Sequence, residues 1–275
     1  MAVVLVTGGS SGIGLATVKR LTASGDTVYS GSRTPAPAGA ADGAAGANAT
    51  HLTLDVADPD SCAAAISSVL DSAGRLDVLV NCAGTGDLAA LEDSSDAAAH
   101  RTFEVNVFGP LRLIRAALPV MRAQGGGRIV NVTSVNDIAP APFGGLYSAS
   151  KAALMSLSYV LGAELTGTGI FVTAVAPGLF RTPMAEGQRS QRAPEGSHYA
   201  KHFDGLARGA DAQLAGAGDP DEAGAAIERL IRSEAPPARL VIGDDGARIE
   251  DMVRRAAPEE YAALLRDSVR QLAAG

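Results

Sequence analysis

The first 25 residues place a glycine-rich segment between a predicted strand and a predicted helix. Residues 2–6 form an apolar, β-branched run of the kind found in buried strands. The sequence TGGSSGIG follows at residues 7–14, and a helical apolar pattern then continues to Gly25. Glycines at such a point allow a tight turn and let backbone N–H groups approach a phosphate at the helix N-terminus. The order of these elements predicts a dinucleotide-binding βα unit.

Short apolar runs that predict further strands recur along the chain. They lie at residues 27–33, 51–54, 76–80, 129–132, 171–176 and 239–243. Helical patterns separate most of them, and such alternation predicts a Rossmann-type α/β fold, a doubly wound parallel sheet in three αβα layers. We expect one domain over residues 1–275, with its site at the carboxyl ends of the strands.

Charge and cysteine usage restrict the partners. The formal net charge is −7 and no Lys/Arg run stands against it, which argues against a nucleic-acid or anionic-membrane partner. No apolar stretch has the length of a membrane span, and the first six residues are too short and uncharged for a signal peptide. Neither the two cysteines nor the four histidines have metal-ligand spacing, so we expect no metal. These features favour a cytoplasmic protein.

A second motif combines Ser134, Tyr147 and Lys151. Ser134 ends a predicted strand, and Tyr147 and Lys151 open a helical pattern thirteen positions later. Residues four apart share a helix face, and a neighbouring ammonium lowers a phenol pKa that is ordinarily about 10. The spacing predicts that Tyr147 is a general acid near neutral pH. A Tyr and a Lys four apart are by themselves more often a solvated face, but the glycine segment upstream favours the functional interpretation.

With these motifs the chain resembles the short-chain dehydrogenase/reductase family. The resemblance implies that Tyr147 donates a proton to a carbonyl oxygen, that Ser134 hydrogen-bonds the same oxygen and that Lys151 binds the nicotinamide ribose. It also implies a fourth catalytic residue, Asn106, which kinks its helix and holds a water that connects the lysine to solvent. From the residues alone, Asn106 in FEVNVFG could equally be a buried hydrogen-bonding side chain.

The resemblance further implies a set of cofactor-binding residues. Besides Tyr147 and Lys151 these are Gly8, Ser10, Ser11, Gly12, Ile13, Gly14, Arg33, Asp55, Val56, Asn81, Ala83, Gly84, Pro177, Gly178 and Thr182. Many dinucleotide folds carry an Asp or Glu where Ser32 stands here, followed by Arg33. A guanidinium pairs well with a 2′-phosphate, so Arg33 predicts NADP(H), although it could be a solvated loop arginine. Cys82 departs from the family's usual Asn-Asn-Ala-Gly.

Three further segments lie outside these motifs. Residues 183–218, where the family selects its substrate, contain glycines without clean periodicity, which predicts a mobile lid segment. Its basic residues could attract an acidic substrate or a carrier-bound thioester, or could simply be solvated. Residues 246–275 predict a helical extension, which resembles the hydroxysteroid- and retinol-dehydrogenase-like branch but could also cover the sheet edge or form a dimer. The Ala-, Gly- and Pro-rich residues 35–50 predict a surface loop.

The combined interpretation is an enzyme. We expect a ketoreductase that uses NADPH to reduce a small-molecule ketone or aldehyde reversibly to the alcohol. A redox-neutral epimerisation or elimination on the same fold is one alternative, and a non-catalytic NADP-sensing protein is another. The helix that contains Tyr147 carries more apolar residues than one face needs, and together with the resemblance this predicts a homodimer or homotetramer.

Overall fold

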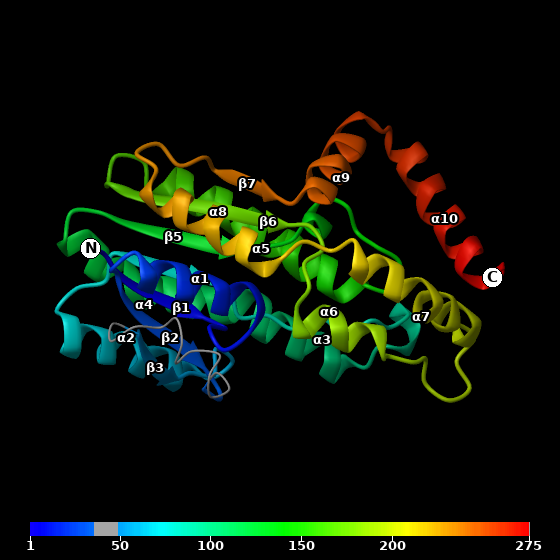
Figure 1. Cartoon of the computed structure of the whole chain (residues 1–275), viewed down its shortest axis with the longest axis horizontal. Helices are drawn as coiled ribbons and strands as arrows, with labels where there is room; N and C mark the ends of the chain where they lie inside the picture. The colour runs from blue at the N-terminus through cyan, green and yellow to red at the C-terminus, as the bar shows by residue number, and fades with distance from the viewer. Residues whose placement is uncertain (36–48, 275) are drawn as a thin grey trace.

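A seven-stranded parallel sheet forms the centre of the protein. The structure, a computed structural model, describes residues 1–35 and 49–274, so most of the surface loop expected over residues 35–50 lies outside the described residues. The strands are β1 (Val3–Thr7), β2 (Thr27–Ser32), β3 (Ala49–Thr53), β4 (Val78–Asn81), β5 (Gly127–Val132), β6 (Ile170–Pro177) and β7 (Arg239–Ile242). Their order is β3-β2-β1-β4-β5-β6-β7, every neighbouring pair is parallel, and the predicted fold class is confirmed (Figure 1).

Helices cover both faces of this sheet. They are α1 (Gly12–Ala23), α2 (Pro59–Ala73), α3 (Asp96–Phe103), α4 (Gly109–Ala123), α5 (Gly145–Glu164), α6 (Pro183–Arg189), α7 (Ala200–Ala215), α8 (Pro220–Arg232), α9 (Asp244–Arg255) and α10 (Pro258–Ala274). Apolar side chains of α1 and α8 bury one face of the sheet, and those of α2 and α4 bury the other. Two separate apolar cores therefore lie on the two faces, as parallel sheets require.

Several helix ends follow directly from the local sequence. The Asp58 carboxylate accepts a hydrogen bond from the backbone N–H of Asp60 at 3.0 Å, and Pro59 occupies the first turn of α2. The same helix ends at Gly74, whose φ of 71° is left-handed. Asp219 caps α8 in the same way, through the N–H of Asp221. An Asp cap, a first-turn Pro and a left-handed Gly are start and stop signals that the local sequence encodes.

The segment between residues 95 and 124 is one bent helical unit. A π-helical turn, Glu104–Phe108, joins α3 to α4, and Asn106 lies inside it. The three pieces form a continuous helical path with a wider turn at its centre. Such π turns occur often at functional sites.

The lid segment is more regular than the sequence suggested. It forms α6 and α7, two helices that the glycines and the lack of clean periodicity did not indicate. Gly205 and Gly209 interrupt the apolar pattern of α7, but Gly205 has a packing role, because a Cβ there would lie 2.2 Å from the carbonyl oxygen of Leu272 in α10. Tertiary contact with α10 therefore overrides the low helix propensity of glycine.

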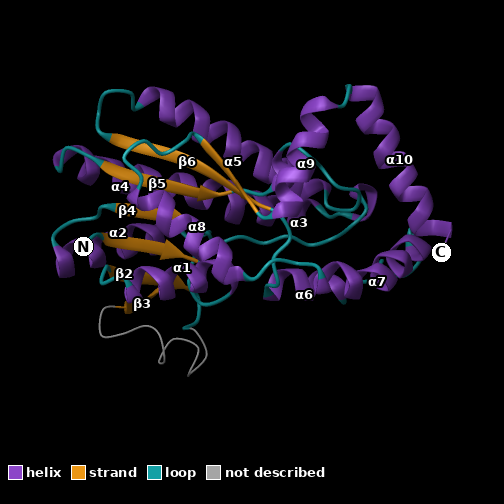
Figure 2. Cartoon of the chain, turned by 45° about the horizontal axis from the view of Figure 1, so that its top comes forward, coloured by secondary structure: helices purple, strands orange, loops and turns teal. Residues whose placement is uncertain are grey.

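The C-terminal extension is helical, as predicted, although α9 begins at Asp244, two residues before the predicted start of the extension. Helix α9 follows β7, and α10 then runs back to lie beside α7 (Figure 2). The Tyr261 hydroxyl donates a hydrogen bond to the carbonyl oxygen of Pro140 at 2.8 Å, which fastens the start of α10 to the body. Across the described part of the chain, none of these helices has the length and apolar character that a bilayer crossing requires.

Candidate active site

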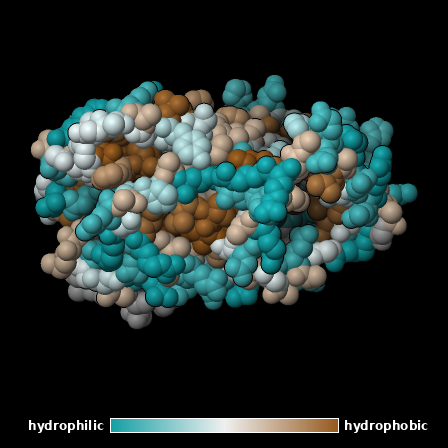
Figure 3. Space-filling view, turned by 90° about the horizontal axis from the view of Figure 1, so that it is seen from above, coloured by the Kyte–Doolittle hydropathy of each residue, from teal (hydrophilic) through white to brown (hydrophobic). Residues whose placement is uncertain are grey.

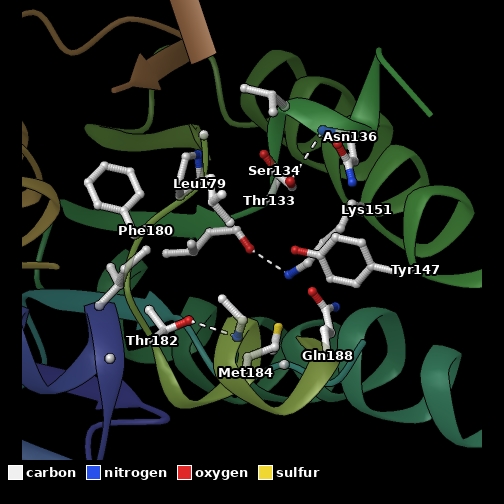
Figure 4. A pocket seen from close by; sticks show the side chains of 18 of the residues that line it. Thr133, Ser134, Asn136, Tyr147, Lys151, Leu179, Phe180, Thr182, Met184 and Gln188 are labelled. Carbon is white, nitrogen blue, oxygen red and sulfur yellow. Dashed lines mark hydrogen bonds between the residues drawn. The ribbon is translucent and has the colours of Figure 1, made fainter. Parts of the chain in front are cut away.

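A cavity of about 340 Å³ opens at the carboxyl ends of β1, β4, β5 and β6. Residues that follow each of these strands line it, together with residues from α1, α5, α6 and α9. Figure 4 shows Ser134, Tyr147 and Lys151 on one side of this space and Thr182, Met184 and Gln188 across from them. The position at the strand ends is the one predicted from the fold.

The glycine segment forms one wall of the cavity. Gly8 has a φ of 68°, and a Cβ on it would lie 2.9 Å from the backbone of Ala83, so only glycine lets the two loops approach this closely. Gly12, with a φ of 51°, packs in the same way against Thr182. In this described part of the chain no side chain caps α1, and its first turn holds no acidic residue. Its first N–H groups are therefore available to an anion, and the wall fits a pyrophosphate.

The three predicted catalytic side chains meet at one point. Ser134 lies two residues beyond β5, whereas Tyr147 and Lys151 belong to the first turns of α5. The Ser134 hydroxyl lies beside the Tyr147 phenol and acts to lower the pKa of that phenol. The Lys151 ammonium donates a hydrogen bond to the carbonyl oxygen of Val132 at 2.9 Å and lies 5.6 Å from the centre of the Tyr147 ring. Gly86 packs against the ring, leaving no room for a side chain at that position.

Burial controls the acidity of this pair. Burial raises the pKa of Tyr147 to about 12, although the Ser134 hydroxyl acts in the opposite direction. Burial also lowers the pKa of Lys151 to about 8. The sequence predicted a lowered pKa for the phenol, and for the structure described here that prediction is wrong because desolvation exceeds the stabilisation of the phenolate. Tyr147 consequently holds its proton at neutral pH, as a proton donor must.

The lowered pKa of Lys151 predicts how stability changes with pH. Its folded pKa of about 8 lies below the ordinary 10.5, so between these values the unfolded chain binds more protons than the folded one. Stability contributed by this group therefore rises with pH across that window, by at most about 1.4 kcal/mol per pH unit. Urea unfolding at pH 7 to 10 measures the difference between the free energies of unfolding of the wild type and of Lys151→Met. A difference that stays constant over this range contradicts the assignment.

Asn106 stands behind the catalytic side chains and does not line the cavity. It is fully buried, and its amide donates to the carbonyl oxygen of Thr85 at 2.8 Å and to the Ser150 hydroxyl at 2.9 Å. Its carbonyl oxygen accepts from the N–H of Thr85 at 2.9 Å, and Ser150 in turn donates to the carbonyl oxygen of Tyr147 at 2.7 Å. Asn106 thus fixes the start of α5 and the loop after β4, an arrangement that serves either interpretation of this residue.

The structure separates the predicted cofactor residues into two groups. Those that line the cavity are Gly8, Ser11, Gly12, Ile13, Gly14, Ala83, Gly84, Tyr147, Lys151, Pro177, Gly178 and Thr182. Those that do not are Ser10, Arg33, Asp55, Val56 and Asn81. Arg33 is exposed just after β2, and Asp55 accepts a hydrogen bond from the N–H of Ala57. Asn81 is buried and donates to Asn131 at 2.8 Å, so its side chain holds β4 to β5.

Sequence reasoning missed two cavity residues in α9, Asp245 and Ile249. The Asp245 carboxylate accepts a hydrogen bond from the N–H of Leu179 at 2.7 Å and packs against Gly178. It therefore holds the loop between β6 and Thr182. The pair of acidic residues after Gly243 is a helix-start signal that could have placed the beginning of α9 correctly, but nothing local indicates that this helix reaches the cavity.

Comparison with known proteins identifies the family of the chain. Residues 2–193 match the family described as short chain dehydrogenase. The chain belongs to the short-chain dehydrogenase/reductase family. It is also 31% identical over 242 residues to 3-ketodihydrosphingosine reductase from Bacteroides thetaiotaomicron, covering 88% of this chain and 87% of the relative. The predicted family membership is confirmed.

Solved structures of short-chain dehydrogenase/reductase type agree in fold. A short-chain dehydrogenase from Streptomyces avermitilis is 36% identical, with a TM-score of 0.79 and coverage of 97% of each chain. An alcohol dehydrogenase from the archaeon Thermococcus sibiricus, complexed with 5-hydroxy-NADP, is 25% identical, with a TM-score of 0.71 and coverage of 88% of this chain and 96% of that one. The protein is an oxidoreductase acting on CH–OH or C=O groups, with a fold that binds a nicotinamide dinucleotide.

Proposed function

We propose that this short-chain dehydrogenase/reductase uses NADPH to reduce a ketone or aldehyde reversibly to the alcohol, with Tyr147 as the proton donor. The observation that carries the proposal is the convergence of Ser134, Tyr147 and Lys151 on one cavity whose opposite wall is the glycine segment at the start of α1. A nucleotide wall and a proton donor in the same space are what hydride transfer to a carbonyl requires.

The side chains divide the chemistry between them. When bound, the reduced nicotinamide supplies a hydride to the carbonyl carbon. The Tyr147 hydroxyl gives its proton to the carbonyl oxygen as negative charge develops there, and the Ser134 hydroxyl hydrogen-bonds the same oxygen. The Lys151 ammonium, which Val132 holds near the ring, stabilises the phenolate that remains. Thr182, at the N-cap of α6, lies across the cavity, where it would contact the cofactor.

Oxidation of NADPH in the presence of a carbonyl panel tests the reaction. The panel extends from small ketoesters to steroid-sized and aromatic ketones, and the alcohol product is identified by chromatography. We expect consumption of NADPH with at least one class of ketone, matched by an equal amount of alcohol. Tight binding of NADPH without consumption by any compound would instead indicate redox-neutral chemistry, such as an epimerisation.

Arg33 is the residue that we expect to select NADPH over NADH. It is exposed beyond the end of β2, and the preceding residue is Ser32, whose hydroxyl donates a hydrogen bond to the carbonyl oxygen of Thr34, in place of the carboxylate that would repel a 2′-phosphate. Removal of a charged hydrogen-bond partner costs about 1.5–3 kcal/mol, equivalent to a roughly 10- to 100-fold loss of binding affinity. Arg33→Ala should therefore weaken NADPH binding by about that factor and leave NADH binding unchanged.

Calorimetric titration of both cofactors measures this preference. Arg266→Ala, at an exposed position on α10, is the matched control and should leave both affinities unchanged. An unaltered ratio of NADPH to NADH affinity in Arg33→Ala would show that Arg33 is only a solvated arginine.

We also propose that the chain forms a homodimer or homotetramer. Leu157, Tyr159 and Val160 on α5 are 38%, 41% and 53% exposed, and Phe108 in the π-helical turn is 43% exposed. Large apolar side chains gathered on one helix are typical of a surface that another subunit covers. Light scattering should give at least twice the monomer mass, and Val160→Glu should lower it. A monomeric mass across a hundredfold concentration range contradicts the proposal.

A cytoplasmic location is part of the same proposal. Cys62 and Cys82 are both free, and burial raises the pKa of each thiol to about 11. Such thiols are poor nucleophiles and suit a reducing compartment without disulfide formation. Fractionation of the source cells would test the location.

A further inference from the structure

A second cavity of about 80 Å³ adjoins the active-site cavity. The two cavities share four lining residues, Leu88, Leu179, Ala185 and Gln188, so they lie directly beside one another. Figure 4 shows Leu179 and Gln188 facing the same space as Tyr147. The far wall of the second cavity is α7, which contributes Phe203, Leu206, Ala207, Ala210 and Leu214.

The second cavity presents apolar surface to a ligand. The amide of Gln188 donates to the carbonyl oxygen of Gly86 at 2.7 Å. Gln191 accepts from the N–H of Leu88 at 2.6 Å and donates to Asp87 at 3.0 Å. These two glutamines are therefore already bonded to the protein, and Gln213 is exposed. None of the described residues that line this cavity is charged.

Packing on both sides holds α7 in place as a wall. At its start, the rings of Tyr199, His202 and Phe203 each lie 5.3–5.7 Å from the ring of Phe143. Further along, Gly205 packs directly on the backbone of Leu272 in α10. Phe203 belongs both to this aromatic cluster and to the cavity wall. The shape of the cavity is thus built by the lid segment and the C-terminal extension together.

Charges near the two cavities do not favour an anionic substrate. In the active-site cavity the charged lining residues are Lys151 and Asp245, which are hydrogen-bonded to Val132 and to Leu179. Of the basic residues in and beside the lid segment, Arg181 lies 3.7 Å from Asp219 and Lys201 is exposed, and neither lines a cavity. The structure therefore gives no support to an acidic substrate that binds through these two side chains.

We propose that the second cavity binds an unbranched apolar arm of the substrate. The substrate class is then a neutral ketone whose carbonyl lies at Tyr147 and whose alkyl chain runs past Leu179 to α7. A chain fits better than a ring, since a buried cavity that binds benzene has a volume of about 150 Å³, and the second cavity has about 80 Å³. This inference rests on the proposed reductase function, which places the carbonyl.

A series of straight-chain methyl ketones tests the inference. The kcat/KM with NADPH is measured from 2-butanone to 2-decanone. For the carbons that enter the second cavity we expect a rise of about fourfold per methylene, the factor that corresponds to burial of one CH₂. Ala207→Leu fills the cavity from α7, so it should abolish this rise. Ala212→Leu, on an exposed position of the same helix, should keep the wild-type slope.

Each outcome decides between the two proposals. If 2-butanone is reduced but kcat/KM rises equally with chain length in Ala207→Leu and in the control, the second cavity does not bind an apolar arm. The reductase function then still stands. If no ketone is reduced, the reductase function fails. Calorimetric titration of the NADP⁺-loaded protein with 2-butanol and 2-octanol then tests whether the second cavity binds an apolar arm. The apolar arm is supported if the wild type binds 2-octanol more tightly than 2-butanol and Ala207→Leu removes this difference. It is overturned if the wild type binds the two alcohols with equal affinity. If Ala207→Leu does not fold, Leu206→Ala replaces it and should move the optimum to longer chains.

Discussion

Tyr147→Phe is expected to lower kcat for ketone reduction by about 10²- to 10⁴-fold, because a positioned general acid contributes a factor of that size. The phenyl ring keeps the packing against Gly86 and removes only the hydroxyl that reaches Ser134. Since the proton is given in the transition state, kcat and kcat/KM should fall together while NADPH affinity changes little. Steady-state kinetics and a direct titration of NADPH measure the two quantities.

A second tyrosine on the same helix supplies the control. Tyr159 is 41% exposed and lies outside the cavity, so Tyr159→Phe should retain wild-type turnover. Retention of more than a tenth of the wild-type kcat in Tyr147→Phe would assign proton donation to another group, with Ser134 the first to examine.

Arg239→Met is expected to lower the free energy of unfolding by about 3–5 kcal/mol, the usual cost of breaking a buried ion pair. Arg239 is 7% exposed at its side chain and donates to Asp137, whose side chain is completely buried, at 2.6 Å. It also donates to Glu250 of α9 at 3.1 Å. Without the guanidinium, the buried Asp137 carboxylate loses its hydrogen-bonded cation. Urea unfolding followed by circular dichroism measures the loss.

Two further variants show whether burial causes this effect. Arg255 pairs with Asp251 on the surface of α9, with side chains 78% and 57% exposed, so Arg255→Met should cost less than about 1 kcal/mol. Asp137→Asn added to Arg239→Met should recover part of the stability, because the unpaired charge is then absent. If Arg239→Met and Arg255→Met lower the free energy of unfolding equally, burial of the Arg239–Asp137 pair does not increase its contribution to stability.

The ion pair also joins the C-terminal extension to the active site. Asp137 follows Ser134 closely, and its N–H donates to the Ser134 carbonyl oxygen at 3.0 Å. Glu250 belongs to α9, and Asp245 at the start of that helix holds Leu179 on the cofactor side. Helix α9 is therefore fastened to the loops on both sides of the cavity, and its position cannot change without moving one of them.

Features that depend on neighbours in the chain could be predicted from the sequence. The buried strands, the glycine segment and the caps at Asp58 and Asp219 are encoded by residues a few positions apart. The spacing of Tyr147 and Lys151 on one helix has the same local origin. Alternation of these units is enough to define a parallel sheet, and the strand ends then define where the site lies.

Tertiary structure decided the features that depend on residues far apart in the sequence. Gly205 of α7 leaves room for the backbone of Leu272 in α10, and Asp245 reaches the cavity because α9 folds back over Leu179. The raised pKa of Tyr147 likewise reflects burial by several segments, which the helical spacing to Lys151 did not include. Desolvation and close packing are sums over contacts between distant segments. The local sequence therefore determines which side chains are present. The assembled fold determines their acidity, their partners and the shape of the space around them.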